Sequence, residues 1–188
     1  MTHSAPPVPS QTPFVSLSRS TLSTLRAAIA RDSGAGSAAA WLQEAGYAGG
    51  AATYEAFREW LSAQGLSDPG ALGVEGFGRE ASRFFSELGW GSLQVGAIGD
   101  SVALVDAPAW SEAEGESLDG QPSCHLSTGL FADFFGRMAG EPLAVMEVEC
   151  RAAGNDRCRF LLGSAEVMQA LYDGMAAGQS YEEAARSL

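Results

Sequence analysis

Three cysteines and one glutamate are the residues of this sequence whose types and spacing could support metal chemistry. Cys150 and Cys158 flank a seven-residue stretch that contains glycine, asparagine and aspartate, and such a stretch can form a turn that brings two thiols together. Glu147 precedes Cys150 by three residues, and Cys124 begins a segment with helical periodicity. Zinc takes thiolate, imidazole and carboxylate ligands in a tetrahedral arrangement. By spacing alone three interpretations stay open, because the cysteines could hold a metal, close a disulfide hairpin or pack as small buried apolar residues.

Two neighbouring residues compete for the same role. His125 follows Cys124 directly, and Glu149 lies on the same side of an ideal β-strand as Glu147, because side chains alternate along a strand. The start of a helix carries a partial positive charge, which favours a thiolate at Cys124. The residues alone therefore give a candidate cluster without choosing its fourth member.

The elements that must position these residues follow from apolar periodicity. Six segments have apolar residues at helical spacing: 17–32, 37–50, 52–65, 74–91, 124–141 and 164–178. β-rich runs predict a hairpin within 92–106, a strand over 142–150 and a strand over 157–163. The glycines at 49–50 predict a break between the second and third helices. A capping box formed by Ser180 and Glu183 predicts a last short helix.

This order of elements predicts an α+β fold in which helices pack on an antiparallel sheet of about four strands. A stretch that contains proline and glycine, after the first helices, divides the chain in two. We expect a disordered leader at 1–13, an N-terminal helical region at 14–66, a second domain at 74–178 and a C-terminal helix or tail at 179–188.

Composition excludes several classes of function. The chain has 188 residues, a formal net charge of −12 and a pI of about 4.4. Such a charge repels nucleic acid and anionic membranes, so neither is expected as a partner. No apolar run reaches the length of about 18 residues that a membrane span needs. The N-terminal sequence lacks the basic start and apolar core of a secretory signal, and three cysteines without such a signal favour the reducing cytoplasm.

The segment from Trp90 to Gly163 resembles the 4-vinyl-reductase domain. That domain is the sensor region of aromatic-responsive transcription activators and is similar in fold to the TRAPP vesicle-tethering subunits. The matching features are GWG after an amphipathic helix, a hairpin, WSEA, and the stretch CHLSTGLFADFFGRMAGEPLAVMEVECRAAGNDRCRFLL. The most specific features are a Cys that opens a helix, a strand that ends in E-x-x-C-R-A-x-G, and a second hairpin Cys before an aromatic residue. The N-terminal helices match only in outline.

The resemblance implies a structural zinc ion. Zinc-binding members of the family use the first Cys, the Glu of E-x-x-C and both hairpin Cys, and these correspond here to Cys124, Glu147, Cys150 and Cys158. Four protein ligands make a closed site without a coordinated water, so no hydrolytic activity is expected. The family pattern is what separates Glu147 from Glu149.

The resemblance also implies a buried pocket for a small hydrophobic or aromatic molecule beside the metal. The candidates lie on two predicted helices and on the segment between them. They are Phe84, Phe85, Trp90, Trp110, His125, Phe131, Phe134, Phe135 and Met138. For each aromatic residue plain core packing is the alternative, because aromatic side chains at helical spacing usually form core. His125 is the polar candidate, and its alternatives are a solvated position or support of a metal ligand.

These features favour a stand-alone, zinc-stabilised module that binds a small hydrophobic or aromatic molecule and acts as a sensor or regulatory unit. The resemblance implies a homodimer formed through the helices of 14–66, and it is compatible with an unidentified protein partner. A TRAPP-like protein-interaction adaptor is the main alternative. A tetrapyrrole vinyl reductase, or its accessory protein, is less favoured. The sequence has no G-x-G-x-x-G dinucleotide motif and no evident Ser–His–Asp or paired-carboxylate arrangement, which argues against an enzyme.

Overall fold

A four-stranded antiparallel sheet lies at the centre of the fold, with the strand order β1-β2-β4-β3. The computed structural model describes residues 14–66, 68–115, 117 and 120–188. The strands are β1 (Gln94–Ile98), β2 (Val102–Ala107), β3 (Ala144–Glu149) and β4 (Cys158–Gly163). Helices pack on this sheet, so the predicted α+β class is confirmed. The leader predicted at 1–13 lies outside the described residues.

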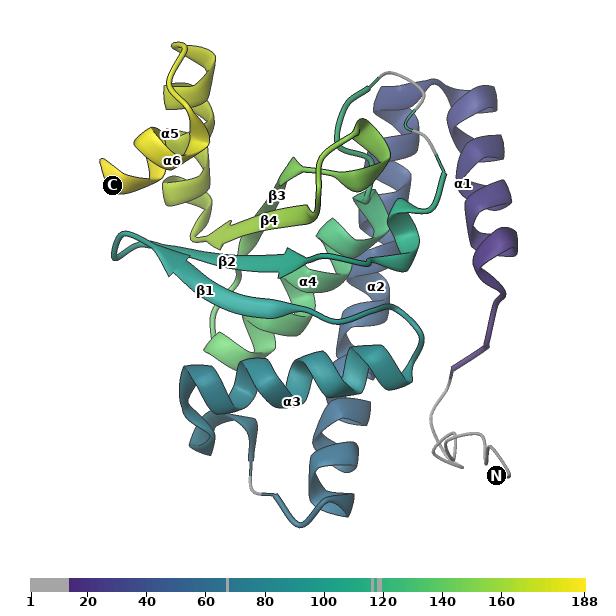
Figure 1. Ribbon diagram of the computed structural model, residues 1–188, viewed down its shortest axis with the longest axis vertical. Coiled ribbons are helices and arrows are strands. Elements are labelled where there is room, and N and C mark those ends of the chain that lie inside the picture. Colours follow the sequence, from purple (N-terminus) through teal and green to yellow (C-terminus); the bar gives the residue numbers. More distant parts are fainter. Residues whose placement is uncertain (1–13, 67, 116, 118–119) are drawn as a thin grey trace.

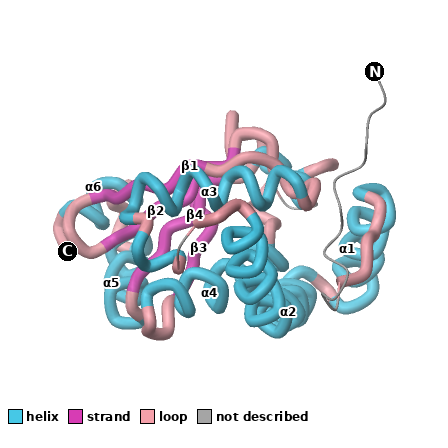
Figure 2. Tube along the Cα trace, turned by 90° about the horizontal axis from the view of Figure 1, so that it is seen from below, coloured by secondary structure: helices cyan, strands magenta, loops and turns pink. Residues whose placement is uncertain are grey.

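Six α-helices surround the sheet in the described parts of the chain (Figure 1). They are α1 (Arg19–Ser33), α2 (Ala35–Ala63), α3 (Gly73–Glu87), α4 (His125–Ala139), α5 (Ala165–Ala176) and α6 (Tyr181–Arg186). Single 3-10 turns occur at Pro69–Ala71, Ser111–Ala113 and Arg151–Ala153. In Figures 1 and 2, α1 lies at the opposite end of the molecule from α5 and α6. None of the helices in the described ranges is long and apolar enough to cross a membrane.

Each face of the sheet contributes to its own apolar core. Val105 of β2 and Phe160 of β4 are register partners, and both belong to the larger core together with side chains of α2, α3 and α4. Leu161, the next residue along β4, belongs to a smaller core with side chains of α5 and α6. Because successive side chains of a strand point to opposite faces, α4 and the α5–α6 pair cover opposite sides of the sheet.

The second and third predicted helices form one continuous helix, α2, so the break predicted at 49–50 is wrong. Glycines permit close packing at this place and do not end the helix. A Cβ atom on Gly46 would lie 1.9 Å from the carbonyl oxygen of Leu126, and one on Gly129 would lie 1.9 Å from the carbonyl oxygen of Gln43. Only glycine allows such an approach of two backbones, and α2 and α4 accordingly lie side by side (Figure 2).

The N-terminal helices share the larger core with the rest of the chain. Phe57 and Leu61 of α2 are fully buried among side chains of α3 and α4. The domain limits at 14–66 and 74–178 stay a prediction. The C-terminal segment 179–188 contains α6, which begins with the predicted capping box.

Candidate metal centre and aromatic core

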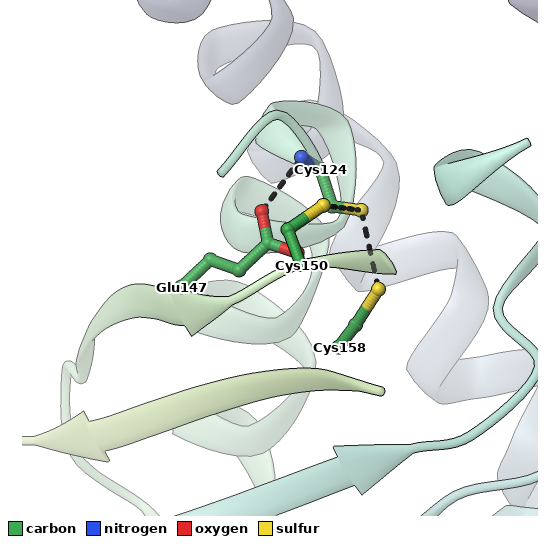
Figure 3. A group of neighbouring side chains, drawn as sticks. All are labelled: Cys124, Glu147, Cys150 and Cys158. Atoms are coloured by element: carbon green, nitrogen blue, oxygen red, sulfur yellow. Dashed lines mark hydrogen bonds between the residues drawn. The ribbon is translucent and has the colours of Figure 1, made fainter. Parts of the chain in front are cut away.

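Three elements bring the predicted metal ligands together (Figure 3). Cys124 is the N-cap of α4, Glu147 lies in β3, Cys150 follows β3, and Cys158 begins β4. The Sγ atom of Cys124 lies 3.8 Å from that of Cys150 and 3.8 Å from that of Cys158. One ligand atom from each of the four residues can be chosen so that all lie within 4.8 Å of one another. Tetrahedral zinc, with bonds of about 2.3 Å to sulfur, requires neighbouring sulfur atoms to be about 3.8 Å apart, so the spacing fits.

The hairpin turn holds Cys150 in place. All three cysteines are buried and free, so no disulfide closes the hairpin in the described chain. The backbone N–H of Cys150 donates to Oδ1 of Asn155 at 2.9 Å, and its carbonyl oxygen accepts the N–H of Asn155 at 3.1 Å. Gly154 has a φ of 94° where the chain reverses, a conformation that favours glycine. This turn sets the position of Cys150 opposite Cys158.

A β-bulge decides which glutamate joins the cysteines. The register passes from Glu147 opposite Phe160 to Glu149 opposite Arg159, so one extra residue is inserted in β3. Glu147 reaches the backbone N–H of the α4 N-cap, whereas Glu149 pairs with Arg159 and accepts a hydrogen bond from Tyr181 of α6. The two glutamates would share one side of an ideal strand, and the bulge separates them.

The carboxylate of Glu147 is the part of the cluster that a cation would complete. Its Oε2 atom accepts the N–H of Cys124 at 2.8 Å, whereas its Oε1 atom is buried and has no hydrogen-bond partner among the described residues. Burial and the nearby charge of Cys150 raise the pKa of Glu147 to about 8. Hydrogen bonds from the thiols of Cys124 and Cys158 lower the pKa of Cys150. A thiolate and an unpaired carboxylate oxygen at one buried point fit the requirements of a divalent metal.

A second carboxylate, which the sequence analysis did not identify, supports the same end of α4. The side chain of Glu112 is fully buried and accepts the N–H of Leu126 at 2.9 Å and the N–H of Ser127 at 2.7 Å. The indole N–H of Trp110 donates to the hydroxyl of Ser127 at 2.7 Å. Cys124, as N-cap, offers no side-chain hydrogen bond to the helix, so Glu112 replaces the usual cap. The WSEA stretch was a signal for this role, but nothing local links it to a helix that begins later in the chain.

Arg26 connects α1 to this network. Its guanidinium donates to the carbonyl oxygens of Glu112 and Ser123, and its Nε atom lies 3.3 Å from Oε1 of Glu112. Burial raises the pKa of Glu112, and the charge of Arg26 opposes that change. Because Ser123 directly precedes Cys124, the position of α1 is tied to the segment that presents the first cysteine.

Five of the predicted pocket residues pack against one another in the larger core. They are Phe85, Trp110, Phe131, Phe134 and Phe135. The ring centroid of Phe134 lies 5.2 Å from that of Phe85 and 5.2 Å from that of Phe135, with the rings edge to face. Such pairs contribute about 0.5–1.5 kcal/mol beyond the burial of their surface. Met138 is partly buried at the margin of the same core.

The other three candidates lie at two separate cavities. Phe84 and Trp90 line a cavity of about 260 Å³ between α2, α3 and the segment that leads into α1. His125 lines a cavity of about 180 Å³ between α1, α2 and the loop before α4. The five packed residues line neither of them. The sequence analysis missed Trp60, which also lines the larger cavity, because Trp60 lies beside the apolar stripe of its helix.

The metal cluster lies within a stretch that matches a known domain. Residues 111–164 match the vinyl-4-reductase domain. The matched stretch runs from the 3-10 turn that holds Glu112 to the N-cap of α5, and it contains all four residues of the cluster. The predicted resemblance to the 4-vinyl-reductase domain is thereby confirmed. No curated protein matches the chain.

Solved structures share the fold at low sequence identity. The phenol-responsive sensory domain of the transcription activator PoxR, in a crystal structure with phenol, has a TM-score of 0.66 and 16% identity, with coverage of 89% of this chain and 84% of that domain. A trafficking protein particle complex subunit 3 from Naegleria fowleri, covalently bound to palmitic acid, has a TM-score of 0.56 and 14% identity, with coverage of 77% and 91%. A vinyl-4-reductase family protein from Methanocaldococcus jannaschii has a TM-score of 0.40 and 18% identity, with coverage of 54% and 71%. The first two comparisons establish for the chain the fold that this sensory domain shares with the TRAPP subunit.

Proposed function

We propose that the chain is a zinc-stabilised module that binds a small hydrophobic or aromatic molecule and acts as a sensor or regulatory unit. The observation that carries this proposal is a buried cluster of three thiols and one carboxylate inside a fold shared with a phenol-responsive sensory domain. A cavity of about 260 Å³ at the margin of the aromatic core offers space for a small molecule.

In this proposal zinc is a structural cross-link between the start of α4 and the β3–β4 hairpin. Three thiolates and one carboxylate would fill the four positions and leave none for a water molecule. Glu147 is suited to hold its place, because one oxygen accepts the N–H of Cys124 and the other has no hydrogen-bond partner among the described residues. The protons that the thiols and Glu147 retain without metal leave on binding, so the affinity for metal falls as the pH falls.

We also propose that two copies associate through the helices of 14–66. Leu25 of α1 and Trp41 and Tyr47 of α2 are large apolar side chains that are at least half exposed. A second subunit that covers them would remove apolar surface from water. Sedimentation of the purified chain tests this point, and a monomer at micromolar concentration would contradict it.

Metal analysis of the purified chain tests the central proposal. We expect one zinc per chain, and we expect Cys150→Ser to lose most of it, because a hydroxyl is a poor substitute for a thiolate. A matched pair isolates the carboxylate: Glu147→Gln should weaken zinc binding, whereas Glu149→Gln on the same strand should retain one equivalent. A wild-type chain that takes up no zinc under reducing conditions would rule the site out.

Mass spectrometry of gently purified protein tests ligand binding. We expect a small hydrophobic or aromatic molecule to accompany the intact chain, because such a ligand in a closed apolar site dissociates slowly. If none is retained, binding of added aromatic molecules to the zinc-loaded chain is the decisive measurement. Failure of both, with zinc present, would leave the site as a structural centre and remove the sensor function.

A second candidate function is a protein-interaction adaptor with a filled core. The observation in its favour is that Phe85, Phe131 and Phe134 contact each other without an intervening cavity. An adaptor would melt at the same temperature with and without small aromatic molecules, and it would co-purify with a protein partner.

A further inference from the structure

A cavity outside the packed aromatic core has walls made of two tryptophans. We name it the tryptophan cavity and define it by Trp60, Phe84, Leu88, Trp90 and the segment 14–22. It lies where the end of α3 meets α2, and the residues that lead into α1 form its remaining side. Its volume of about 260 Å³ exceeds the roughly 150 Å³ of an engineered apolar cavity that binds benzene. It falls just below the range of about 300–1,000 Å³ typical of drug-sized ligands.

Interactions fix both indole rings. The N–H of Trp60 donates to Oε2 of Glu87 at 2.8 Å, and the guanidinium of Arg83 lies 5.2 Å from the centre of the Trp60 ring. The ring of Trp90 stacks on that of Trp110, with 5.6 Å between centroids and an angle of 24°. Rings held in this way are preorganised surfaces for a flat ligand, which lowers the entropy lost on binding.

Hydrogen-bond acceptors dominate the polar part of the lining. Glu87 has one carboxylate oxygen bonded to Trp60, and its other oxygen accepts no hydrogen bond from the described residues. The guanidinium of Arg19, the cation of the lining, is engaged by Glu114 at 2.7 Å and by the carbonyl oxygen of Gly89 at 3.2 Å. The free hydrogen-bonding capacity is therefore that of a carboxylate, which selects a ligand that donates.

The rim of the cavity is apolar and exposed. Phe14, Leu17 and Leu88 show 37%, 61% and 40% of their surface to solvent. A ligand between these side chains and the tryptophans would take apolar surface of both partners out of water, at about 25 cal/mol per Å². The packed core offers no comparable gain, because Phe85, Phe131 and Phe134 are already buried there.

We propose that the tryptophan cavity binds a flat aromatic molecule of one or two rings that carries an N–H or O–H donor, with the donor directed at Glu87. This inference deepens the proposed ligand-binding function and rests on it. It places the ligand at the margin of α3, outside the aromatic core, and it names indole as a probe of suitable size and chemistry. Benzofuran, which has nearly the same shape but no N–H, is the matched comparison.

Calorimetric titration of the zinc-loaded full chain tests the proposal. We expect indole to bind about tenfold more tightly than benzofuran, because one hydrogen bond to a carboxylate is worth roughly 1.5 kcal/mol or more. Leu88→Asp places a charge on the cavity wall and should weaken both probes at least tenfold. The control is Val74→Asp at the other end of α3, where the side chain is also exposed, and it should leave both affinities within twofold.

A second variant tests the role of the carboxylate. Glu87→Leu removes the acceptor, so the ratio of indole to benzofuran affinity should fall from about ten to about one, an outcome that a loss of shape alone would not produce. Zinc content and melting temperature of each variant show whether it is folded. Should Leu88→Asp lose stability, the milder Leu88→Ser carries the same comparison.

The outcomes separate this inference from the function on which it rests. If indole binds the wild type and neither Leu88→Asp nor Glu87→Leu changes its affinity, the ligand site lies elsewhere and the inference is wrong, while the ligand-binding function stands. If neither probe binds a zinc-loaded wild type up to its solubility, the inference is also wrong. In that case the co-purification experiment alone decides the proposed function.

Discussion

The two halves of α4 are buried in different ways. At its N-terminal end Glu112 and Glu147 accept hydrogen bonds from backbone N–H groups around Cys124, and one oxygen of Glu147 has no hydrogen-bond partner among the described residues. Its C-terminal half carries Phe131 and Phe134, which are wholly buried against other rings. The metal end has an unmet need for a cation, whereas the aromatic half is complete through packing.

This difference shows how one helix can depend on two kinds of interaction. Burial of carboxylates and thiolates costs free energy unless an opposite charge accompanies them. Burial of aromatic rings is favourable by itself, and its contribution depends on filled volume. Removal of the ion and removal of ring volume should therefore have separable effects on the same molecule.

Removal of the metal is expected to have the largest effect. A chelator, under reducing conditions, should lower the free energy of unfolding by several kcal/mol and up to about 10 kcal/mol, because structural zinc sites contribute on that order. Denaturant unfolding with and without chelator, followed by tryptophan fluorescence, measures the difference. Readdition of zinc should restore the original midpoint, and equal midpoints in all three states would remove the contrast between the two halves.

Loss of ring volume is the next effect in size. Phe134→Ala should destabilise the chain by about 3–5 kcal/mol through the lost burial and the cavity left behind. Zinc content should stay at one equivalent, because Phe134 belongs to the aromatic half of the helix and is no member of the cluster. Tyr172→Ala is the control, since that side chain is 57% exposed on α5, and it should change stability by no more than about 0.5 kcal/mol. Loss of zinc from folded Phe134→Ala would show that the two halves act as one unit.

The two regions also differ in what the sequence could predict. The thiols of Cys150 and Cys158 lie on either side of one turn, so local spacing was enough to bring them together. Glu112 was missed because its partners are backbone N–H groups of a helix whose N-cap, Cys124, comes twelve residues later. Such a contact depends on tertiary placement, which residue types along the chain do not encode locally.

The aromatic residues illustrate a different limit of prediction. Helical spacing correctly indicates that Phe131 and Phe134 face inward, but rings that fill a core and rings that line a cavity have the same spacing. Trp60 shows the converse, because it lines a cavity although it lies outside the apolar stripe of its helix. Whether a ring packs or lines a space is decided by the volume of its neighbours from other elements.

Glu112→Gln perturbs the metal end without changing a cluster residue. The amide retains the size of the side chain but loses the charge opposite Arg26 and one of the acceptors for Leu126 and Ser127. We expect a loss of about 2–3 kcal/mol together with weaker zinc binding in a competition titration. The exposed Glu114, changed to Gln, should cost no more than about 0.5 kcal/mol, and equal zinc affinities of the two variants would show that Glu112 serves stability alone.

The smallest effects come from glycines of α2, and their signs should differ. Gly49 has open space around its Cα, so Gly49→Ala should stabilise the helix by about 0.5–1 kcal/mol. Gly46→Ala should destabilise by about 1–3 kcal/mol, because its Cβ would meet the carbonyl oxygen of Leu126 and a backbone can yield only by moving. That movement shifts the first turn of α4, next to Cys124. Gly46→Ala should therefore also weaken zinc binding, and a variant that loses stability but keeps its zinc affinity would show that the metal end tolerates displacement of the helix it caps.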